Sequence, residues 1–95
     1  MINPPEDLRR KEKLEAFDRL LTIMDELRLN CPWDKKQTLE SIRHLTIEET
    51  YELSDAILNE NIEEVKKEIG DLMLHMVFYS KIADEKGAFD VADAL

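Results

Sequence analysis

The chain has 95 residues, of which 22 are acidic and 13 are basic, so its formal net charge is −9. This length suits a single domain, which we expect to span residues 1–95. The excess of acid argues against binding to nucleic acid or to an anionic membrane surface, because both require clustered Lys and Arg. With one cysteine and no apolar signal segment at its start, the protein is expected to be cytoplasmic, where thiols stay reduced.

Amphipathic helices are the predicted elements, because apolar residues recur at spacings of three and four while glycine and proline are sparse. The first helix is expected over about residues 6–29. It ends before Pro32, because proline disfavours helical geometry in the residue that precedes it. Trp33 then lies in a short connection, and either Asp34 or Thr38 is a candidate cap for the next helix.

Two further long helices and the start of a fourth complete the predicted all-α fold. They are expected over about residues 38–58 and 62–86 and from residue 90 onward. Asn61 and Asp90 are the candidate N-caps of the third and fourth helices. Gly87 is the residue type that most often takes the left-handed conformation after a helix. The fourth element looks cut short, because only residues 91–95 follow its cap.

The second helix places a carboxylate on its apolar side. Its apolar residues span an arc of roughly 120°, since each residue advances the helix by roughly 100°. Glu49 falls inside this arc, and Glu52 lies just beyond its edge. A carboxylate in such a position is costly to bury unless it is paired or binds a metal ion. The third helix carries a polar stripe beside its own apolar arc, formed by Glu64, Glu68, Asp71 and His75.

An antiparallel pairing of these two helices brings their acids together. Glu52 and Glu68 lie eight residues on either side of Glu60, and Glu49 and Asp71 lie eleven residues on either side. Four carboxylates without a cysteine suit a hard cation, so the pattern predicts a site for Mg²⁺, with Mn²⁺ as the alternative. The plainer interpretation is a set of solvated acids, because acidic pairs at these spacings arise easily by chance among 22 acidic residues.

The third helix also predicts self-association. From residue 75 to residue 82 it is apolar on nearly every side. Complete burial of such a segment requires more protein than one chain of this size supplies. We therefore expect a homo-oligomer, either a dimer or a tetramer.

Two motifs in the sequence resemble a known family. The segment Glu48-Glu49-Thr50-Tyr51-Glu52, followed after fifteen residues by Glu68-Ile69-Gly70-Asp71, resembles the E-E-x-x-E…E-x-x-D signature of the MazG nucleoside triphosphate pyrophosphohydrolases. The segment Cys31-Pro32-Trp33-Asp34-Lys35-Lys36-Gln37-Thr38 is similar to the C-P-W-D-x-x-Q-T sequence that precedes the signature in that family. The resemblance covers about residues 15–95, with both motifs in the family's order and spacing.

The resemblance implies a fold and a reaction. MazG-like domains are helical bundles of the all-α NTP pyrophosphatase type, in which antiparallel helices are completed by dimerisation. They hydrolyse an NTP or dNTP between the α and β phosphorus to the monophosphate and pyrophosphate, with Mg²⁺. Glu48 matches the leading acid of the signature, and with Glu49 it is the candidate for catalytic work such as water activation. The residues that match the family's metal ligands are Glu49, Glu52, Glu68 and Asp71.

Three further side chains are candidates for contacts with the nucleoside triphosphate. Lys36 and Lys81 carry the positive charge that phosphate requires, although either could be a solvated surface lysine. Trp33 could stack on a nucleobase, and its alternative role is that of a core anchor beside the loop. His75 is expected to be a packed or hydrogen-bonded histidine rather than a metal ligand.

The end of the sequence departs from the family pattern. Family members usually continue into a further helix with a basic R-R-H-P-H-like segment, which is missing from this sequence. The chain is therefore expected to be a single unit of the N-terminal type, either whole or truncated. A non-catalytic helical module, which dimerises or regulates a partner and keeps the acids without turnover, is the alternative function. A di-iron bundle is excluded, because its Glu-x-x-His pairs are missing.

Overall fold

The computed structural model describes residues 6–95 and contains five helices and no strand within that range. This architecture confirms the predicted all-α fold. Residues 1–5 of the expected domain lie outside the described part of the chain. Among the described helices, none combines the length and the apolar character needed to cross a bilayer. The helices are α1 (Arg10–Asn30), α2 (Pro32–Lys35), α3 (Leu39–Leu58), α4 (Ile62–Glu85) and α5 (Val91–Ala94).

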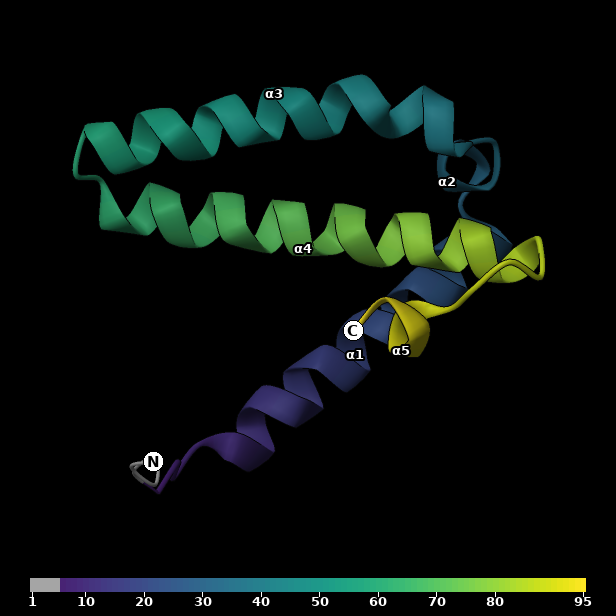
Figure 1. Cartoon of the computed structure of the whole chain (residues 1–95), viewed down its shortest axis with the longest axis horizontal. Helices are drawn as coiled ribbons and strands as arrows, with labels where there is room; N and C mark the ends of the chain where they lie inside the picture. Colours follow the sequence, from purple (N-terminus) through teal and green to yellow (C-terminus); the bar gives the residue numbers. More distant parts are fainter. Residues whose placement is uncertain (1–5) are drawn as a thin grey trace.

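Helices α3 and α4 form an antiparallel hairpin and lie side by side over most of their length (Figure 1). Helix α1 packs against the C-terminal end of α4, while its N-terminal half extends away from the other helices (Figure 1). The short helix α5 turns back and contacts α4. One end of the hairpin is therefore covered by a third helix, and the end with the tight turn is not.

The helix boundaries follow the capping residues that the sequence offers. Thr38 begins α3 with a capping box, in which its hydroxyl oxygen accepts from the Ser41 backbone N–H and the Ser41 hydroxyl oxygen accepts from the Thr38 backbone N–H. Asn61 and Asp90 cap α4 and α5 by accepting from the backbone N–H three residues later. Gly87 follows α4 with a φ of 71°, in the left-handed region. These four predictions are confirmed.

Two details differ from the prediction. Residues 32–35 form the one-turn helix α2, where we expected an irregular connection, because Pro32 occupies the first helical position and needs no N–H donor there. Helix α1 begins at Arg10 rather than near residue 6. The Asp7 carboxylate accepts hydrogen bonds from the Arg9 backbone N–H and the Lys13 ammonium, which hold a turn in front of the helix.

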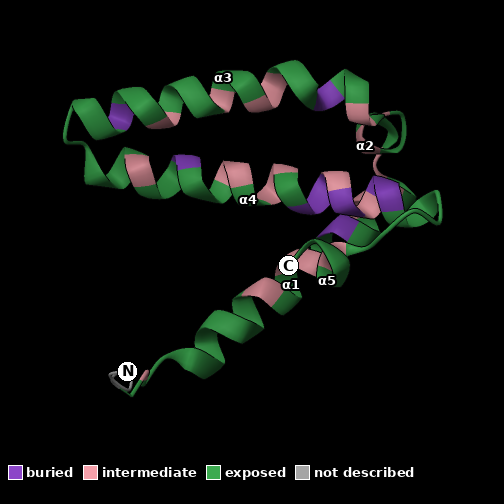
Figure 2. Ribbon diagram, viewed as in Figure 1, coloured by how far each residue is buried: buried purple, intermediate pink, exposed green. Residues whose placement is uncertain are grey.

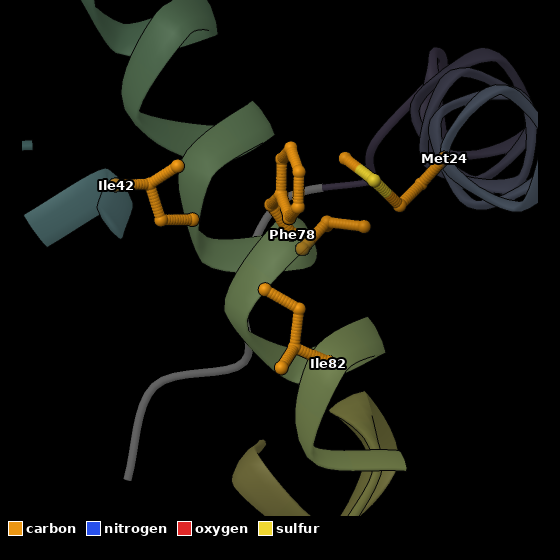
Figure 3. Close-up of a cluster of buried hydrophobic side chains, with 5 residues drawn as sticks. Met24, Ile42, Phe78 and Ile82 are labelled. Atoms are coloured by element: carbon orange, nitrogen blue, oxygen red, sulfur yellow. The ribbon is translucent and has the colours of Figure 1, made fainter. Parts of the chain in front are cut away.

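The hydrophobic core lies at the end of the molecule where α1, α3 and α4 meet. Figure 3 shows Phe78 of α4 between Ile42 of α3 and Met24 of α1. Figure 2 shows buried residues concentrated at this end, whereas the turn end of the hairpin is mostly exposed. The five core side chains, each at most 4% exposed, are Met24, Ile42, Val77, Phe78 and Ile82.

One chain buries most of the segment that we expected to need a partner. Val77, Phe78 and Ile82 are each buried, because α1 covers the side of α4 that α3 leaves open. Met76 remains 46% exposed. The expectation that residues 75–82 require a second chain is therefore wrong for most of that segment.

Candidate metal centre

Three carboxylates from α3 and α4 converge midway along the hairpin. Glu49, Glu68 and Asp71 each offer a carboxylate oxygen, and these oxygens all lie within 4.8 Å of one another. Glu68 is only 2% exposed, and the other two are half-buried. An acidic side chain as buried as Glu68 is rare unless it is paired. The acidic cluster, as we call these three residues, is the natural candidate for a functional site.

Helix geometry explains why the three side chains meet. Glu68 and Asp71 are three residues apart on α4 and so project from the same face. Glu49 reaches them from α3, because the tight turn between the helices fixes their register. In that turn the Asn61 backbone N–H donates to the Ala56 carbonyl at 3.0 Å. The structure thus aligns Glu49 with Asp71, as their equal spacing from Glu60 predicted.

The close approach of Glu49, Glu52 and Glu68 shifts their pKa values. The pKa of Glu49 rises to about 7, first because the protonated carboxyl donates a hydrogen bond to Glu68, then because of burial and nearby negative charge. The same hydrogen bond from Glu49 lowers the pKa of Glu68. Glu52 also has a raised pKa, with its interaction with Glu68 as the largest cause. The acids therefore titrate as a coupled group in which Glu49 keeps a proton up to near-neutral pH.

A hard divalent cation fits the electrostatic needs of the acidic cluster. As carboxylates, Glu49 and Glu68 each leave a buried oxygen, Oε2, without a hydrogen-bond donor in the described part of the chain. The Lys67 ammonium is 3.7 Å from the other Glu68 oxygen and remains largely exposed. Burying an unpaired carboxylate is costly, and oxygen ligands without cysteine are those that Mg²⁺ and Mn²⁺ prefer.

Two of the predicted site residues lie at the border of the acidic cluster. Glu52 is exposed and stands outside the group of oxygens that share the 4.8 Å limit. Glu48 is also exposed, next to Glu49 on α3. An open cavity of about 360 Å³ extends from Glu52 and Glu68 toward the turn, with Lys67 in its wall. Solvent and a ligand thus have access to the cluster from this side.

The three predicted substrate contacts lie elsewhere on the chain. Trp33, in α2, is 54% exposed, which excludes its alternative role as a buried core anchor. Lys36 is exposed directly after α2. The Lys81 ammonium forms an ion pair with Asp25 of α1 at 2.9 Å. Ten residues separate Lys81 from Asp71, a distance of roughly 15 Å along a helix, so one chain does not bring Lys81 to the acidic cluster.

The polar contacts next to the acidic cluster were only partly foreseen. His75 hydrogen-bonds through Nδ1 to the Thr46 hydroxyl at 3.0 Å, which confirms that it is a hydrogen-bonded histidine. Thr46 also hydrogen-bonds to the Tyr79 hydroxyl. Neither Thr46 nor Tyr79 was predicted to matter. The available signal was spacing, because Thr46 precedes Glu49 by three residues and so shares its face of α3.

Comparison with known proteins gives a family match over this part of the chain. Residues 37–95 match the MazG nucleotide pyrophosphohydrolase domain. The chain belongs to the MazG family. The matched MazG domain contains α3, α4 and the whole acidic cluster, whereas α1, which completes the core, precedes it.

Several relatives of this MazG domain are named nucleoside triphosphate pyrophosphohydrolase. The Escherichia coli K12 protein is 48% identical over 83 residues, which cover 84% of this chain and 32% of the relative. A Thermotoga maritima protein, named nucleoside triphosphate pyrophosphohydrolase/pyrophosphatase MazG, is 45% identical over 87 residues, covering 90% and 34%. The Mycobacterium tuberculosis protein is 35% identical over 100 residues, covering 100% and 30%. The chain thus spans about a third of the length of these relatives.

Proposed function

We propose that the chain binds a divalent cation, Mg²⁺ or Mn²⁺, at the acidic cluster and hydrolyses nucleoside triphosphates to the monophosphate and pyrophosphate. One observation carries this proposal: the buried Glu68 meets Glu49 and Asp71 across the helix hairpin, and Oε2 of Glu68 and of Glu49 have no hydrogen-bond donor in the described part of the chain. The largely exposed Lys67 ammonium approaches only the other oxygen of Glu68, at 3.7 Å. Glu52 stands one turn from Glu49 and is proposed as the fourth ligand. The names of the relatives support the reaction class.

The chemistry of the substrate fits an acidic site. A triphosphate is itself strongly negative, so carboxylates can approach it only through a cation. A bound Mg²⁺ would neutralise charge on the phosphate oxygens and make water a better nucleophile. Water would add to one phosphorus of the α–β anhydride while the bond to the bridging oxygen breaks. Glu48, exposed beside the ligands, is proposed to accept the proton that this water loses.

The roles of the distal candidates depend on the reach of the substrate. Trp33 and Lys36 precede α3, and Glu49 is ten residues into that helix from Leu39, roughly 15 Å along its axis. We propose that Trp33 and Lys36 contact the base and phosphates of a nucleotide held at the cluster of a second chain. The Lys81 ammonium is paired with Asp25 and would contact a phosphate only after that ion pair opens.

Pyrophosphate release tests the proposed reaction. The chain is incubated with a panel of NTPs and dNTPs and Mg²⁺, and pyrophosphate is measured by a coupled assay. Glu49→Gln and Asp71→Asn each remove a charged ligand and should lower the rate by about 100-fold or more, the equivalent of a few kcal/mol. Glu63→Gln is the matched control, because Glu63 is exposed on α4 and pairs only with Lys66. Equal rates in all four proteins would contradict the proposed site.

A non-catalytic module is the alternative function. It predicts a folded chain that binds Mn²⁺ at the acidic cluster and releases no pyrophosphate from any nucleotide of the panel. Mn²⁺ binding by electron paramagnetic resonance, measured on the same samples, separates this outcome from loss of the metal site itself. Loss of Mn²⁺ binding in Glu49→Gln, with no turnover in the unaltered chain, would favour the module.

We further propose that the chain forms a homodimer through the exposed apolar side of the hairpin. Tyr51, Leu58 and Ile62 are 70%, 77% and 73% exposed, which is unusual for a group of large side chains on one pair of helices. Ile57, which precedes Leu58 on α3, is 57% exposed. Light scattering should give twice the chain mass of 11.2 kDa. Ile57→Asp should give a monomer, and Leu14→Asp on the far part of α1 should not. A monomeric unaltered chain at micromolar concentration would contradict the dimer.

A further inference from the structure

One side-chain network joins α3 to α4 beside the acidic cluster. The Thr46 hydroxyl of α3 hydrogen-bonds to His75 Nδ1 at 3.0 Å and to the Tyr79 hydroxyl, both on α4. The Tyr79 hydroxyl donates in turn to the Ile42 carbonyl of α3 at 3.3 Å. Within residues 6–95, every side-chain hydrogen bond between α3 and α4 that does not involve the acidic side chains belongs to this network, which we call the threonine bridge.

The threonine bridge is the next contact layer after the acidic cluster. Thr46 precedes Glu49 by three residues on α3, and His75 follows Asp71 by four residues on α4. Because the helices are antiparallel, both steps lead in the same direction, toward the core. Tyr79 then leads to Ile42, whose side chain is 2% exposed within the core. The bridge therefore lies between the core end of the hairpin and the acidic cluster.

The acidic cluster needs such a connection because its own charges oppose it. Once they are ionised, as metal binding requires, carboxylates that face one another across two helices repel, and no ion pair links α3 to α4 in the described part of the chain. Toward the turn, the backbone bond from Asn61 to Ala56 holds the helices together. Toward the core, the first polar attraction between them is the threonine bridge.

We propose that Thr46 is a positioning residue: its hydroxyl, bonded to His75 and Tyr79, sets the spacing of α3 and α4 at the acidic cluster and thereby the affinity of the cluster for a divalent cation. This inference rests on the proposed function, because it assigns a role relative to the cation. Side chains that orient ligands from outside the coordination sphere commonly change metal affinity by about 10–100-fold when they are removed.

Substitutions of one hydroxyl test the positioning role. Thr46→Val keeps the shape and removes the hydroxyl, Thr46→Ser keeps the hydroxyl, and Tyr79→Phe removes the second hydroxyl of the bridge. Thr50→Val is the matched control, because the Thr50 hydroxyl donates only to the Thr46 carbonyl of its own helix at 2.8 Å. For each protein, the Mn²⁺ dissociation constant is measured by electron paramagnetic resonance, and the unfolding free energy is measured in EDTA.

We expect Thr46→Val to raise the Mn²⁺ dissociation constant about tenfold. Tyr79→Phe should also raise this dissociation constant. Thr46→Ser should bind Mn²⁺ nearly as the unaltered chain does, and Thr50→Val should match it. A Thr46→Val protein that is less stable in EDTA but keeps its Mn²⁺ affinity would show a purely structural role and overturn the inference. Equal weakening in Thr46→Ser would also overturn it, because the hydroxyl would then not be responsible.

The remaining results separate failure of the inference from failure of the proposed metal centre. If Thr46→Val does not fold, Tyr79→Phe decides, and an unchanged Mn²⁺ affinity in that variant overturns the inference. If the unaltered chain itself binds no Mn²⁺, the proposed metal centre is wrong and the inference falls with it. Binding by the unaltered chain with no effect of Thr46→Val contradicts the positioning role alone.

Discussion

Arg28 of α1 forms a bidentate contact with Glu85 at the end of α4. Its Nε donates to one carboxylate oxygen at 2.9 Å, and a terminal nitrogen donates to the other at 2.6 Å. The remaining terminal nitrogen donates to the carbonyls of Asp34 and Gln37 at 2.6 and 3.0 Å. The Arg28 side chain is only 12% exposed, and this single residue links α1 to the end of α4, to α2 and to the segment that follows α2.

Replacing Arg28 should destabilise the fold more than replacing its partner does. Arg28→Lys loses the planar fork and removes the guanidinium donor from the Asp34 and Gln37 carbonyls, so we expect a loss of about 2 kcal/mol in unfolding free energy. Glu85→Gln should lose about 1 kcal/mol. Chemical denaturation at neutral pH measures both. The exposed Lys66–Glu63 pair serves as control, since Lys66→Gln should cost under about 0.5 kcal/mol.

The Arg28–Glu85 contact should also make the stability of the fold depend on pH in the acid range. Hydrogen bonding from Arg28 lowers the pKa of Glu85 below its ordinary value of 4.5. The unfolded chain therefore holds this proton more tightly than the folded chain does. The stabilisation is complete above the unfolded pKa and is lost as pH falls through the folded pKa. Glu85→Gln should reduce the loss of stability below pH 4.5, and an unchanged acid profile would contradict this assignment.

In the metal-free chain, we expect Glu49 to give the stability a pH dependence of the opposite sign. Its pKa rises to about 7 when the chain folds, so the folded state holds this proton more tightly. The associated stability is complete below the unfolded pKa of about 4.5 and is lost as pH rises through 7. In EDTA, Glu49→Gln should flatten the decline and raise the stability at pH 8, by about 1–2 kcal/mol. Denaturation curves between pH 5 and pH 8 provide the measurement.

Met24 predicts how much α1 contributes to the core. It is 1% exposed and packs against α4 from the side opposite α3. Met24→Ala would leave a cavity and should cost about 2–4 kcal/mol. Leu14→Ala, on the same helix but 62% exposed, should change stability by less than about 0.5 kcal/mol. Similar losses in the two variants would mean that α1 does not pack as the structure shows.

The two glycines should respond to alanine in opposite directions. Gly87 has a φ of 71°, and alanine there should cost about 1 kcal/mol because its side chain disfavours the left-handed region. Gly70 lies inside α4 with nothing within 4 Å of an added Cβ. Gly70→Ala should stabilise the helix by about 0.5–1 kcal/mol. Thermal unfolding of both variants tests the pair, and a stabilising Gly87→Ala would contradict the assigned backbone conformation.

The helices were largely predictable because their signals are local. Thr38, Asn61 and Asp90 satisfy the first N–H groups of the helices that they begin, and Gly87 ends α4. The start of α1 and the one-turn helix α2 were not predictable in the same way. They depend on the Asp7 turn and on Arg28, which donates to one carbonyl within α2 and to one that follows it.

The sequence predicted that Glu49, Glu68 and Asp71 lie close together, but it grouped Glu52 with them and could not describe their surroundings. Equal spacing from Glu60 aligned Glu49 with Asp71, because an antiparallel hairpin converts spacing along the chain into height. The near-complete burial of Glu68 could not be predicted by that argument. It depends on how closely α3 approaches α4 and on which side chains surround the carboxylate.

The amino-acid order alone determined that this protein is helical, where α3 and α4 begin and end, and which acids lie at the same level of the hairpin. Each of these follows from contacts between residues at most a few turns apart or from counting residues from the turn. The tertiary structure decided which part of the hairpin α1 packs against. It also produced the raised pKa of Glu49 and the threonine bridge. Each of these depends on distances between side chains of different helices, which no periodic pattern specifies.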